Sequence, residues 1–373
     1  MTTAASTTEY PAKEALTLPL DVIHHIVQNF LPDETQALAN LTLTSRDFHE
    51  LSLRQLYSTC SPGYERPNIK LFFRTITSSP RHASLVKDFS FMDISQEEDS
   101  DGFWDLVVSG LRCMINTIKL QFLFLYLAPM ANVVLSGCTF PNLRTLEWMA
   151  ADDTDDELLR FYQRHPKLSA LRLNWICTRY TDEFYRRLNA VVPDVFPSLE
   201  YLVADEWRLS LILPGRNVWR VCWSPTWRAL SPELLSAFKN VRWMWIEIVD
   251  DDNPRQISLL DLAVSLENLE VFRLGRYTGQ DDLEEFVTRL PRLRRLMFFY
   301  RNSTIKRARR KAIKLFSAGN KDLENIDIAI KSCDDLFHRF RLAIPQNCRG
   351  PGAEVDVVED GEYEVEHHWM ESV

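Results

Sequence analysis

The chain has 373 residues, of which 46% are hydrophobic and 25% charged, and its formal net charge is −9. This composition is typical of an ordinary globular protein, and the length allows a small domain followed by a larger one. The charge is uneven, because residues 350–373 contain eight acidic side chains and no lysine or arginine. The remainder is nearly neutral, which gives no support for a nucleic-acid-binding surface.

The apolar runs are too short for a membrane span, which needs about 18 residues or more. The densest run, residues 120–130, predicts a buried strand and turn. Residues 1–15 are polar and lack the apolar centre of a secretory signal, so we expect a disordered leader. The seven cysteines are widely spaced without a C-x-x-C motif. They favour reduced thiols in a cytoplasmic or nuclear protein and predict no metal site.

Residues 18–57 are predicted to form three short helices. Pro19 fits the start of the first helix, because its missing N–H would have no partner there. The apolar face of this helix follows the helical period. It comprises Leu20, Ile23, Ile26, Val27, Phe30 and Leu31. Pro32 ends the helix.

Two further helices are expected before residue 58. Asp33 can cap the second, in which Leu41 belongs to the buried side. Thr44 or Ser45 can cap the third, which carries Phe48. The three helices therefore form one unit of about forty residues, a size that rarely folds without help from elsewhere.

This pattern resembles the F-box. The resemblance rests on Leu18-Pro19, the acidic Asp21, the amphipathic first helix, the segment Ser45-Arg46-Asp47-Phe48 and the closing Leu56-Tyr57. Family members usually carry glutamate where this chain has Asp21 and often tryptophan where it has Phe48. The resemblance covers residues 16–60 and implies docking to the Skp adaptor of a cullin–RING ubiquitin ligase. The alternative is an ordinary helical cap on a solenoid.

The three helices carry more apolar side chains than one shared core can hide. Each exposed one that a partner covers contributes about 1.5–3 kcal/mol. The candidates for docking on the adaptor are Leu18, Pro19, Leu20, Val22, Ile23, Ile26, Val27, Phe30, Leu31, Leu41 and Phe48. The following part of the same chain could instead cover this surplus.

Residues 64–345 are predicted to form an irregular solenoid of about ten units. Apolar residues at positions n, n+3 and n+5 recur every 19 to 31 residues. That spacing is typical of leucine-rich repeats, in which each unit supplies one strand and one helix. The frames begin at Val86, Ile115, Leu143, Leu168, Leu199, Val218, Val241, Leu269, Leu293 and Leu323.

Helical spacing between the frames indicates an α/β fold. Helices are expected at residues 155–164, 181–192, 232–238, 257–266, 281–290 and 305–316. Alternation of strand and helix implies parallel strands joined by right-handed crossovers, with strands on the concave side and helices outside. The asparagine that usually follows each strand is missing. Irregular repeats of this kind are similar to those that follow the F-box in fungal-type F-box proteins.

Alternate strand residues point to opposite faces, so positions n+2, n+4 and n+6 are expected on the concave face. The candidate target-binding residues there are Arg172, Tyr201, Arg220, Trp243, Trp245, Arg273, Arg295 and Phe299. Tryptophan, tyrosine and arginine are enriched at binding hot spots, and solenoids bind along their concave side. The alternative for the tryptophans is that loops fold over them and bury them.

Two charged segments lie toward the C-terminus. Residues 306–314 contain six basic side chains, a pattern also found in nuclear-import signals. An apolar stripe at helical spacing favours a helix with a solvated basic face instead. We expect the acidic segment, residues 350–373, to be disordered, and the alternative is that it folds back onto the basic helix.

No nucleotide-binding, hydrolase or metalloprotease motif occurs, so we expect no catalytic site, no cofactor and no metal. Our leading hypothesis is a substrate-recognition subunit of a Skp–cullin–F-box ubiquitin ligase. It would bind the Skp-type adaptor, and cullin through it, with its helices, and a target protein with its solenoid. We expect no nucleic-acid or membrane partner.

Three other functions stay open from the sequence. The first is a solenoid interaction scaffold without a link to ubiquitylation. The second is an enzyme whose site assembles from distant residues. The third is a receptor in which a small molecule, held by the tryptophan-lined concavity, joins the target to the chain.

Overall fold

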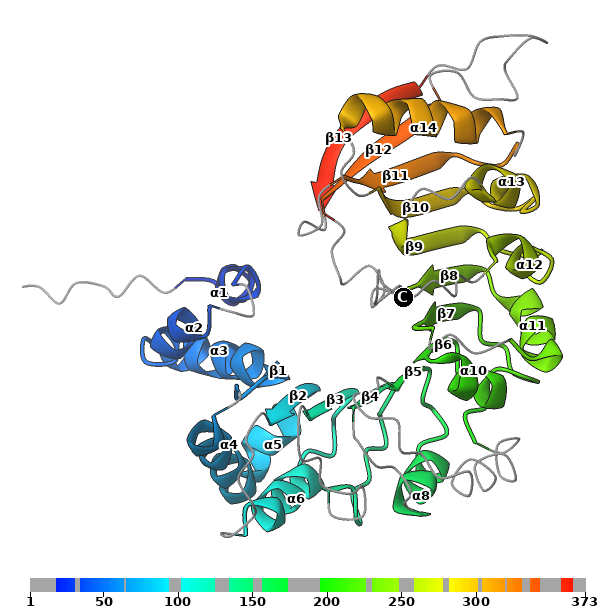
Figure 1. The fold of residues 1–373 in the computed structure, drawn as a ribbon. Coiled ribbons are helices and arrows are strands. Elements are labelled where there is room, and N and C mark those ends of the chain that lie inside the picture. Colours follow the sequence, from blue (N-terminus) through cyan, green and yellow to red (C-terminus); the bar gives the residue numbers. More distant parts are fainter. Residues whose placement is uncertain are drawn as a thin grey trace, which may run out of the picture.

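The structure is a computed structural model of the chain. It describes residues 18–30, 34–63, 65–93, 102–124, 134–149, 156–173, 195–225, 230–247, 258–277, 282–300, 304–318, 321–330, 336–342 and 357–364. These residues form an arc with a continuous sheet along its inner side and helices along its outer side (Figure 1). The predicted α/β solenoid, with strands inside and helices outside, is therefore confirmed at this level. The expected leader, residues 1–15, lies outside the described residues.

Three helices stand at the N-terminal end of the arc: α1 (Leu20–Gln28), α2 (Thr35–Leu41) and α3 (Arg46–Ser58). The carbonyl of Pro19 accepts the first hydrogen bonds of α1. Ser45 caps α3, because its side-chain oxygen accepts a hydrogen bond from the N–H of Phe48 at 3.3 Å. The other proposed cap, Asp33, lies outside the described residues. Helix α3 packs against both α1 and α2 and is the centre of the unit.

Helix α3 leads into the sheet without a linker. Strand β1 (Thr59–Cys60) follows it at once and pairs in parallel with β2 (Asp88–Asp93). The predicted solenoid boundary at residue 64 is therefore too late by one strand. A two-residue strand is too short to show a period, so the sequence gives no signal for it. The helical unit and the solenoid are consequently joined through a shared sheet.

The described residues supply thirteen strands to the sheet, and these lie in chain order. The parallel strands after β2 are β3 (Lys119–Phe124), β4 (Thr145–Met149), β5 (Ala170–Leu173), β6 (Tyr201–Ala204), β7 (Arg220–Trp223), β8 (Trp243–Ile246), β9 (Val271–Tyr277), β10 (Arg295–Tyr300) and β11 (Asn325–Ala329). This order, in which each strand pairs with its predecessor, is that of a solenoid.

The outer side of the arc carries the helices. They are α4 (Arg66–Ser78), α5 (Pro80–Leu85), α6 (Phe103–Cys113), α8 (Asp156–Arg164), α10 (Glu206–Ile212), α11 (Pro232–Ala237) with the short 3₁₀ turn η2 (Phe238–Asn240), α12 (Leu259–Ala263), α13 (Asp282–Thr288) and α14 (Ile305–Ser317). The helix expected at residues 181–192 lies outside the described residues. No helix in the described ranges combines the length and the apolarity of a membrane span.

The repeating apolar frame forms the core between sheet and helices. Nine of the ten predicted frames are buried, with Leu173 half-buried. The frame that begins at Ile115 is wrong, because Ile115 and Ile118 are exposed. In that unit the buried frame begins two residues later, at Thr117. Its hydroxyl donates to the carbonyl of Met114 at 2.8 Å, which allows a polar residue to occupy a core position.

Two antiparallel strands end the sheet. Strand β12 (Leu336–Leu342) is antiparallel to β11, and β13 (Val357–Glu364) is antiparallel to β12. The expectation that residues 350–373 are disordered is therefore wrong for β13. Val357 is buried, and its carbonyl accepts a hydrogen bond from Nη2 of Arg309 on α14 at 3.2 Å. This part of the acidic segment does fold back onto the basic helix, and it extends the solenoid beyond residue 345.

Candidate functional site

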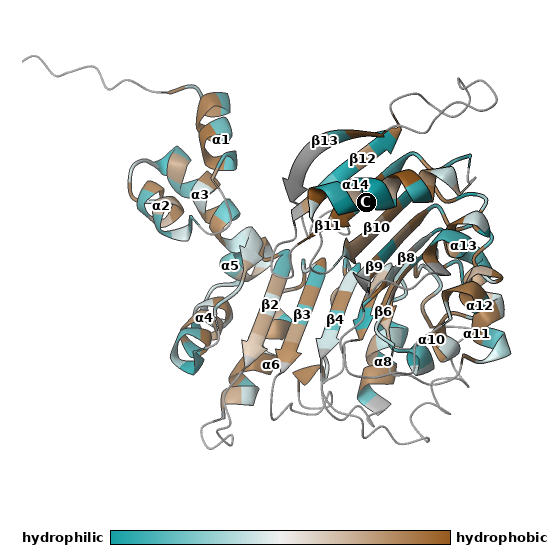
Figure 2. Cartoon of the chain, turned by 45° about the horizontal axis from the view of Figure 1, so that its top comes forward, coloured by the Kyte–Doolittle hydropathy of each residue, from teal (hydrophilic) through white to brown (hydrophobic). Residues whose placement is uncertain are grey.

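The N-terminal end of the helical unit, called its edge below, carries several exposed apolar side chains. Leu18, Leu20 and Val22 are 48%, 62% and 39% exposed, and Leu43, after α2, is 85% exposed. Figure 2 shows the three helices standing away from the main body of the sheet, with hydrophobic residues on α1. Exposed leucine and valine side chains at one end of a molecule are candidates for a surface that another protein covers.

Two of the predicted docking residues are not available on this edge. Ile23 is 4% exposed and Val27 is 2% exposed. They are four residues apart on α1 and therefore share its inward face. Their assignment as docking residues is wrong, because they form the interior of the three-helix unit. The remaining candidates are Pro19, which is exposed, Ile26, Phe30, Leu41 and Phe48, which are half-buried, and Leu31, which lies outside the described residues.

The interior of this unit is small. Within residues 18–30 and 34–58 the buried side chains are Ile23, Val27, Leu38 and Ser52. Most of its other apolar side chains keep part of their surface in water. When a partner covers such a surface, each Å² of apolar area removed from water contributes about 25 cal/mol of binding free energy.

A groove of about 350 Å³ separates the helices from the first unit of the solenoid. Residues of α1, α3 and α5 line it. His24, Arg54 and Lys87 give its rim a basic character, and no acidic side chain of the described residues lines it. The groove is continuous with the helical unit, since α1 and α3 form two of its walls.

The eight predicted target-binding residues lie on strands β5 to β10, at the expected alternate positions. The ladder places them in rows across the sheet. Tyr201, Arg220 and Trp243 are direct neighbours in one row, while Cys222, Trp245 and Arg273 are neighbours in the next. The apolar frame therefore located this face correctly, although it did not determine how open the face is.

Several of these residues are more buried than expected. Trp243, Arg273 and Phe299 are each less than 10% exposed. The guanidinium group of Arg273 lies 4.2 Å from the ring centre of Trp245 and 5.6 Å from that of Phe337 on β12. Neighbouring side chains on a curved inner face crowd one another, so an outward-pointing residue there does not have to be exposed.

The C-terminal end of the inner face is closed. Phe299 belongs to a small apolar cluster with Met297, Ala329 and Phe337. Beside it, the fully buried Asp327 accepts a hydrogen bond from Arg295 at 2.6 Å and another from Arg339 at 2.9 Å. The prediction of an open binding surface is therefore wrong for Phe299, Arg273 and Trp243, which are buried, while Arg295 is half-buried and paired with Asp327. Phe299, Arg273 and Arg295 contact residues of the last strands.

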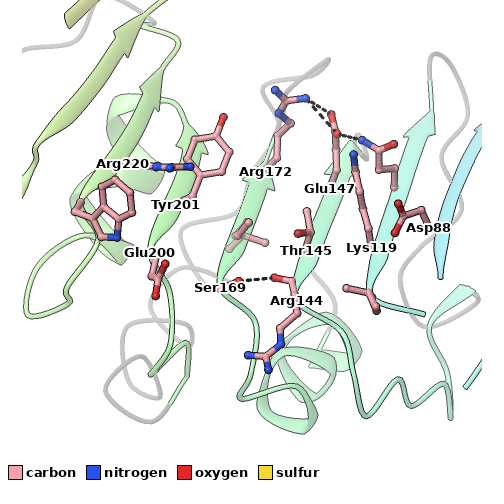
Figure 3. Close-up of a pocket in the computed structure, with 15 residues that line it drawn as sticks. Asp88, Lys119, Arg144, Thr145, Glu147, Ser169, Arg172, Glu200, Tyr201 and Arg220 are labelled. Carbon is pink, nitrogen blue, oxygen red and sulfur yellow. Dashed lines mark hydrogen bonds and ion pairs between the residues drawn. The ribbon is translucent and has the colours of Figure 1, made fainter. Parts of the chain in front are cut away.

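The open part of the inner face lies over β2 to β7. It is a hollow of about 570 Å³ (Figure 3). Thr145, Ser169 and Ala170, which have short side chains, lie at its middle. Tyr201 and Arg220 are part of its lining on one side, and the side chains of β2 to β4 line the other. The hollow therefore forms where short side chains on two strands are flanked by longer side chains on both sides.

A network of polar side chains crosses this hollow. Glu147 is buried, and it accepts a hydrogen bond from Nε2 of Gln121 at 2.6 Å and from Nη1 of Arg172 at 3.3 Å. Burial alone would lower the pKa of Arg172, but Glu147 and the hydroxyl of Tyr201 outweigh it and raise that pKa. Burial raises the pKa of Tyr201, which therefore keeps its phenolic proton.

The side chain of Arg220 is held by stacking. Its guanidinium group lies 4.3 Å from the ring centre of Trp219 and 5.8 Å from that of Trp243. Cation–π contacts fix the plane of the group. Of the predicted residues, the structure brings Arg172, Tyr201 and Arg220 together in the hollow.

Sequence reasoning missed other lining residues. Lys119 and Gln121 line the hollow from β3. A shift of the frame by two residues keeps the alternation, so positions n+4 and n+6 of the frame at Ile115 already place them on the inner face. They were missed because the candidates were chosen for aromatic and arginine side chains. Strand pairing with β2 and β4 fixes the register, but a single unit shows it only when its core positions are apolar.

Potential metal ligands and thiols are located in the part of the chain that the structure describes. It contains no group of three or more potential metal-binding side chains. Cys60, Cys113, Cys138 and Cys222 are free thiols. Burial raises the pKa of Cys60 to about 12 and that of Cys138 to about 11, so these thiols are poor nucleophiles.

No family model matches the chain, and neither does any curated protein sequence. Among solved structures it is similar to an internalin from Listeria monocytogenes, with a TM-score of 0.34 and 10% sequence identity. The similarity covers 82% of this chain and 92% of the internalin chain. A likeness of this size carries no functional information.

Proposed function

We propose that the chain is a substrate-recognition subunit of a Skp–cullin–F-box ubiquitin ligase. The helices α1 to α3 dock on the Skp-type adaptor, and the inner face of the sheet holds a target protein. The observation that carries the proposal is the exposure of Leu18, Leu20 and Val22 at the N-terminal end of a helical unit with four buried residues. The helix pattern and capping at Ser45 also agree with the F-box resemblance.

The connection between the two surfaces supports this role. Helix α3 continues directly into β1, and the ring of Tyr57 on α3 stacks on His82 of α5 with centroids 4.7 Å apart. Glu50 of α3 also forms an ion pair with Arg81 of α5. A helical unit fixed to the solenoid in this way would hold a target at a constant position relative to the adaptor, which favours transfer by proximity.

Affinity purification of the tagged full-length chain tests the proposal. Leu20→Asp is expected to reduce recovery of the adaptor and cullin about 10- to 100-fold, because it places a charge where a leucine would be covered. The matched control is Leu71→Asp, which changes a leucine that is 65% exposed on α4, outside the helical unit. Wild type and the control should recover both proteins, and circular dichroism should show that both variants fold.

Equal recovery of the adaptor with wild type and with Leu20→Asp would overturn the proposal. Ile23→Asp is not a suitable test, since Ile23 is buried and its replacement should unfold the helices. Adaptor binding without cullin incorporation or ubiquitylation of a bound protein would favour the second candidate, an interaction scaffold. The observation that favours the interaction scaffold is the open hollow of the inner face.

A further inference from the structure

The hollow over β2 to β7 has the dimensions of a peptide site. Six neighbouring strands at about 4.8 Å span about 24 Å, which is the length of about seven residues of extended chain. The short side chains of Thr145, Ser169 and Ala170 leave the middle of this path open. The hollow is partly open to solvent and its lining comes from six neighbouring strands, which suits an extended segment.

One end of the path gathers hydrogen-bond donors. In Figure 3 the side chain of Tyr201 lies between those of Arg172 and Arg220, and its hydroxyl points to the same side as the guanidinium group of Arg172. Glu200, the nearest carboxylate along the chain, points the opposite way. Two cations and a phenol that keeps its proton therefore lie together, and the buried carboxylate of Glu147 pairs with one of the two cations, Arg172.

These donors are oriented before a ligand binds. The carboxylate of Glu147 holds Arg172, and Trp219 holds the plane of Arg220. Over the whole hollow, the basic side chains of Lys119, Arg144, Arg172 and Arg220 outnumber the acidic ones of Asp88, Glu147 and Glu200. Side chains that are already fixed lose little conformational entropy when a ligand binds. They therefore favour a ligand whose polar groups match their positions.

We propose that the hollow binds an extended segment of about seven residues from a target protein, and that Arg172, Tyr201 and Arg220 recognise an acidic side chain of that segment. Guanidinium groups pair with carboxylates through parallel hydrogen bonds, and the tyrosine hydroxyl donates a third. A lysine or arginine at this place would meet two positive charges. An apolar side chain would remove water from these donors without replacing its hydrogen bonds. The inference rests on the proposed function only in taking the occupant to be a target.

Selection from a random heptapeptide display library on the purified full-length chain tests this inference. Peptides that bind are expected to share aspartate or glutamate at one fixed position. Ala170→Trp, which fills the hollow from an inner-face position, should weaken the best peptide about tenfold or more. Replacing the fixed acid by its amide should weaken it about 10- to 100-fold, the range of a charge-assisted hydrogen bond.

Arginine variants locate the acid. Arg220→Gln should weaken the peptide about tenfold or more, whereas Arg160→Gln, on the outer helix α8, should leave it unchanged. Arg172→Gln leaves the buried Glu147 without its cation, so it is combined with Glu147→Gln, and thermal unfolding is measured for each variant. The filling variant keeps every polar group and gives a result even if the double variant unfolds.

Several results would overturn the inference. They are selection of no peptide, enrichment of basic or apolar residues without a fixed acid, and binding that Ala170→Trp leaves unchanged. The same Ala170→Trp chain is also tested for adaptor binding. If the wild-type chain binds the adaptor but no peptide, only this inference is contradicted. If the wild-type chain does not bind the adaptor, the proposed function is contradicted.

Discussion

His165 shows how a single residue connects two units of the solenoid. It is buried, its Nδ1 lies 2.6 Å from the carbonyl oxygen of Phe161, and its Nε2 accepts a hydrogen bond from the N–H of Phe140 at 2.9 Å. Because Nε2 accepts and Nδ1 faces an oxygen, the ring is neutral with its proton on Nδ1. Burial lowers the pKa of His165, and Arg164 adds to this, although the Phe161 carbonyl acts against it.

His165 should make the stability of the chain depend on pH. An unfolded histidine has a pKa of about 6.5. Above that pH both states are neutral, so the hydrogen bonds contribute fully. As the pH falls through about 6.5 the unfolded chain takes up a proton and the folded chain does not, so stability is lost until the folded histidine is protonated as well.

His165→Phe keeps a ring but removes the acceptor and the titration. Phenylalanine is the residue at the same place before Pro141 and Pro197. We expect this variant to lose about 1–3 kcal/mol of unfolding free energy near neutral pH, because the N–H of Phe140 loses its partner. The loss should shrink as the pH falls to about 5. Urea unfolding of both proteins at several pH values measures it, and a loss that does not vary with pH would contradict the assignment.

Helices α4 and α6 approach each other closely at Gly110. A Cβ atom added at this position would collide with the ring of Phe73, which is fully buried. The ring cannot move away freely, because it also packs against Phe89 and Phe91 of β2. Glycine is therefore needed here for space, although it weakens a helix by up to about 1 kcal/mol relative to alanine.

Gly110→Ala decides between these two effects. Helix propensity alone would make the variant more stable, whereas the collision should make it less stable by about 1–3 kcal/mol. The matched control is Ser109→Ala on the exposed side of the same helix, which is expected to change stability by less than about 0.5 kcal/mol. Denaturant unfolding measures both, and a stabilised Gly110→Ala would show that the helices are not packed this closely.

The whole molecule is a one-dimensional array with two different ends. Each strand pairs only with its neighbours in chain order, so stability is approximately a sum of units and the contacts between them. The helices α1 to α3 close the first end, and β12 and β13 close the last. Terminal units of a solenoid have one open side and need such caps. The exposed edge at Leu20 leaves the first cap incomplete, whereas Val357 completes the last.

Ending the chain after residue 349 tests the role of the last cap. It removes β13 and exposes the edge of β12, together with part of the core around Phe340. We expect proteases to cut the last units, residues 295–342, faster, while units around β2 to β6 keep their protection. Limited proteolysis with mass spectrometry identifies the cut sites. Uniform loss of protection along the chain would contradict a solenoid whose units contact only their neighbours.

The period of the solenoid could be predicted because each frame is local. Leu143, Leu146 and Trp148 reveal a strand within six residues, and their burial follows from the alternation of strand side chains. Thr117 hides its frame, since a hydroxyl bonded to the preceding turn satisfies a core position without being apolar. Only the pairing of its strand with the neighbouring strands identifies this unit, and the spacing of apolar residues in the sequence does not reveal that pairing.

Residues that depend on distant partners could not be predicted. Trp243 and Phe299 point to the inner face as expected. The burial of Trp243 depends on its neighbours across the sheet, such as Arg220, and that of Phe299 depends on Phe337 of β12. The strand at Val357 forms in an acidic segment whose composition is typical of disorder, because pairing with β12 satisfies its backbone groups. Similarly, spacing places Ile23 on the same face as Phe30, and only the position of α3 determines which of them is buried.

Hydrogen exchange of the full-length chain, with and without a purified Skp-type adaptor, tests the central claim most directly. The account predicts that the adaptor slows exchange in residues 18–30 and in the adjoining part of α3, and leaves the strands β5 to β7 unchanged. Exchange in residues 18–30 that the adaptor does not alter would contradict it, as would protection confined to the inner face of the sheet.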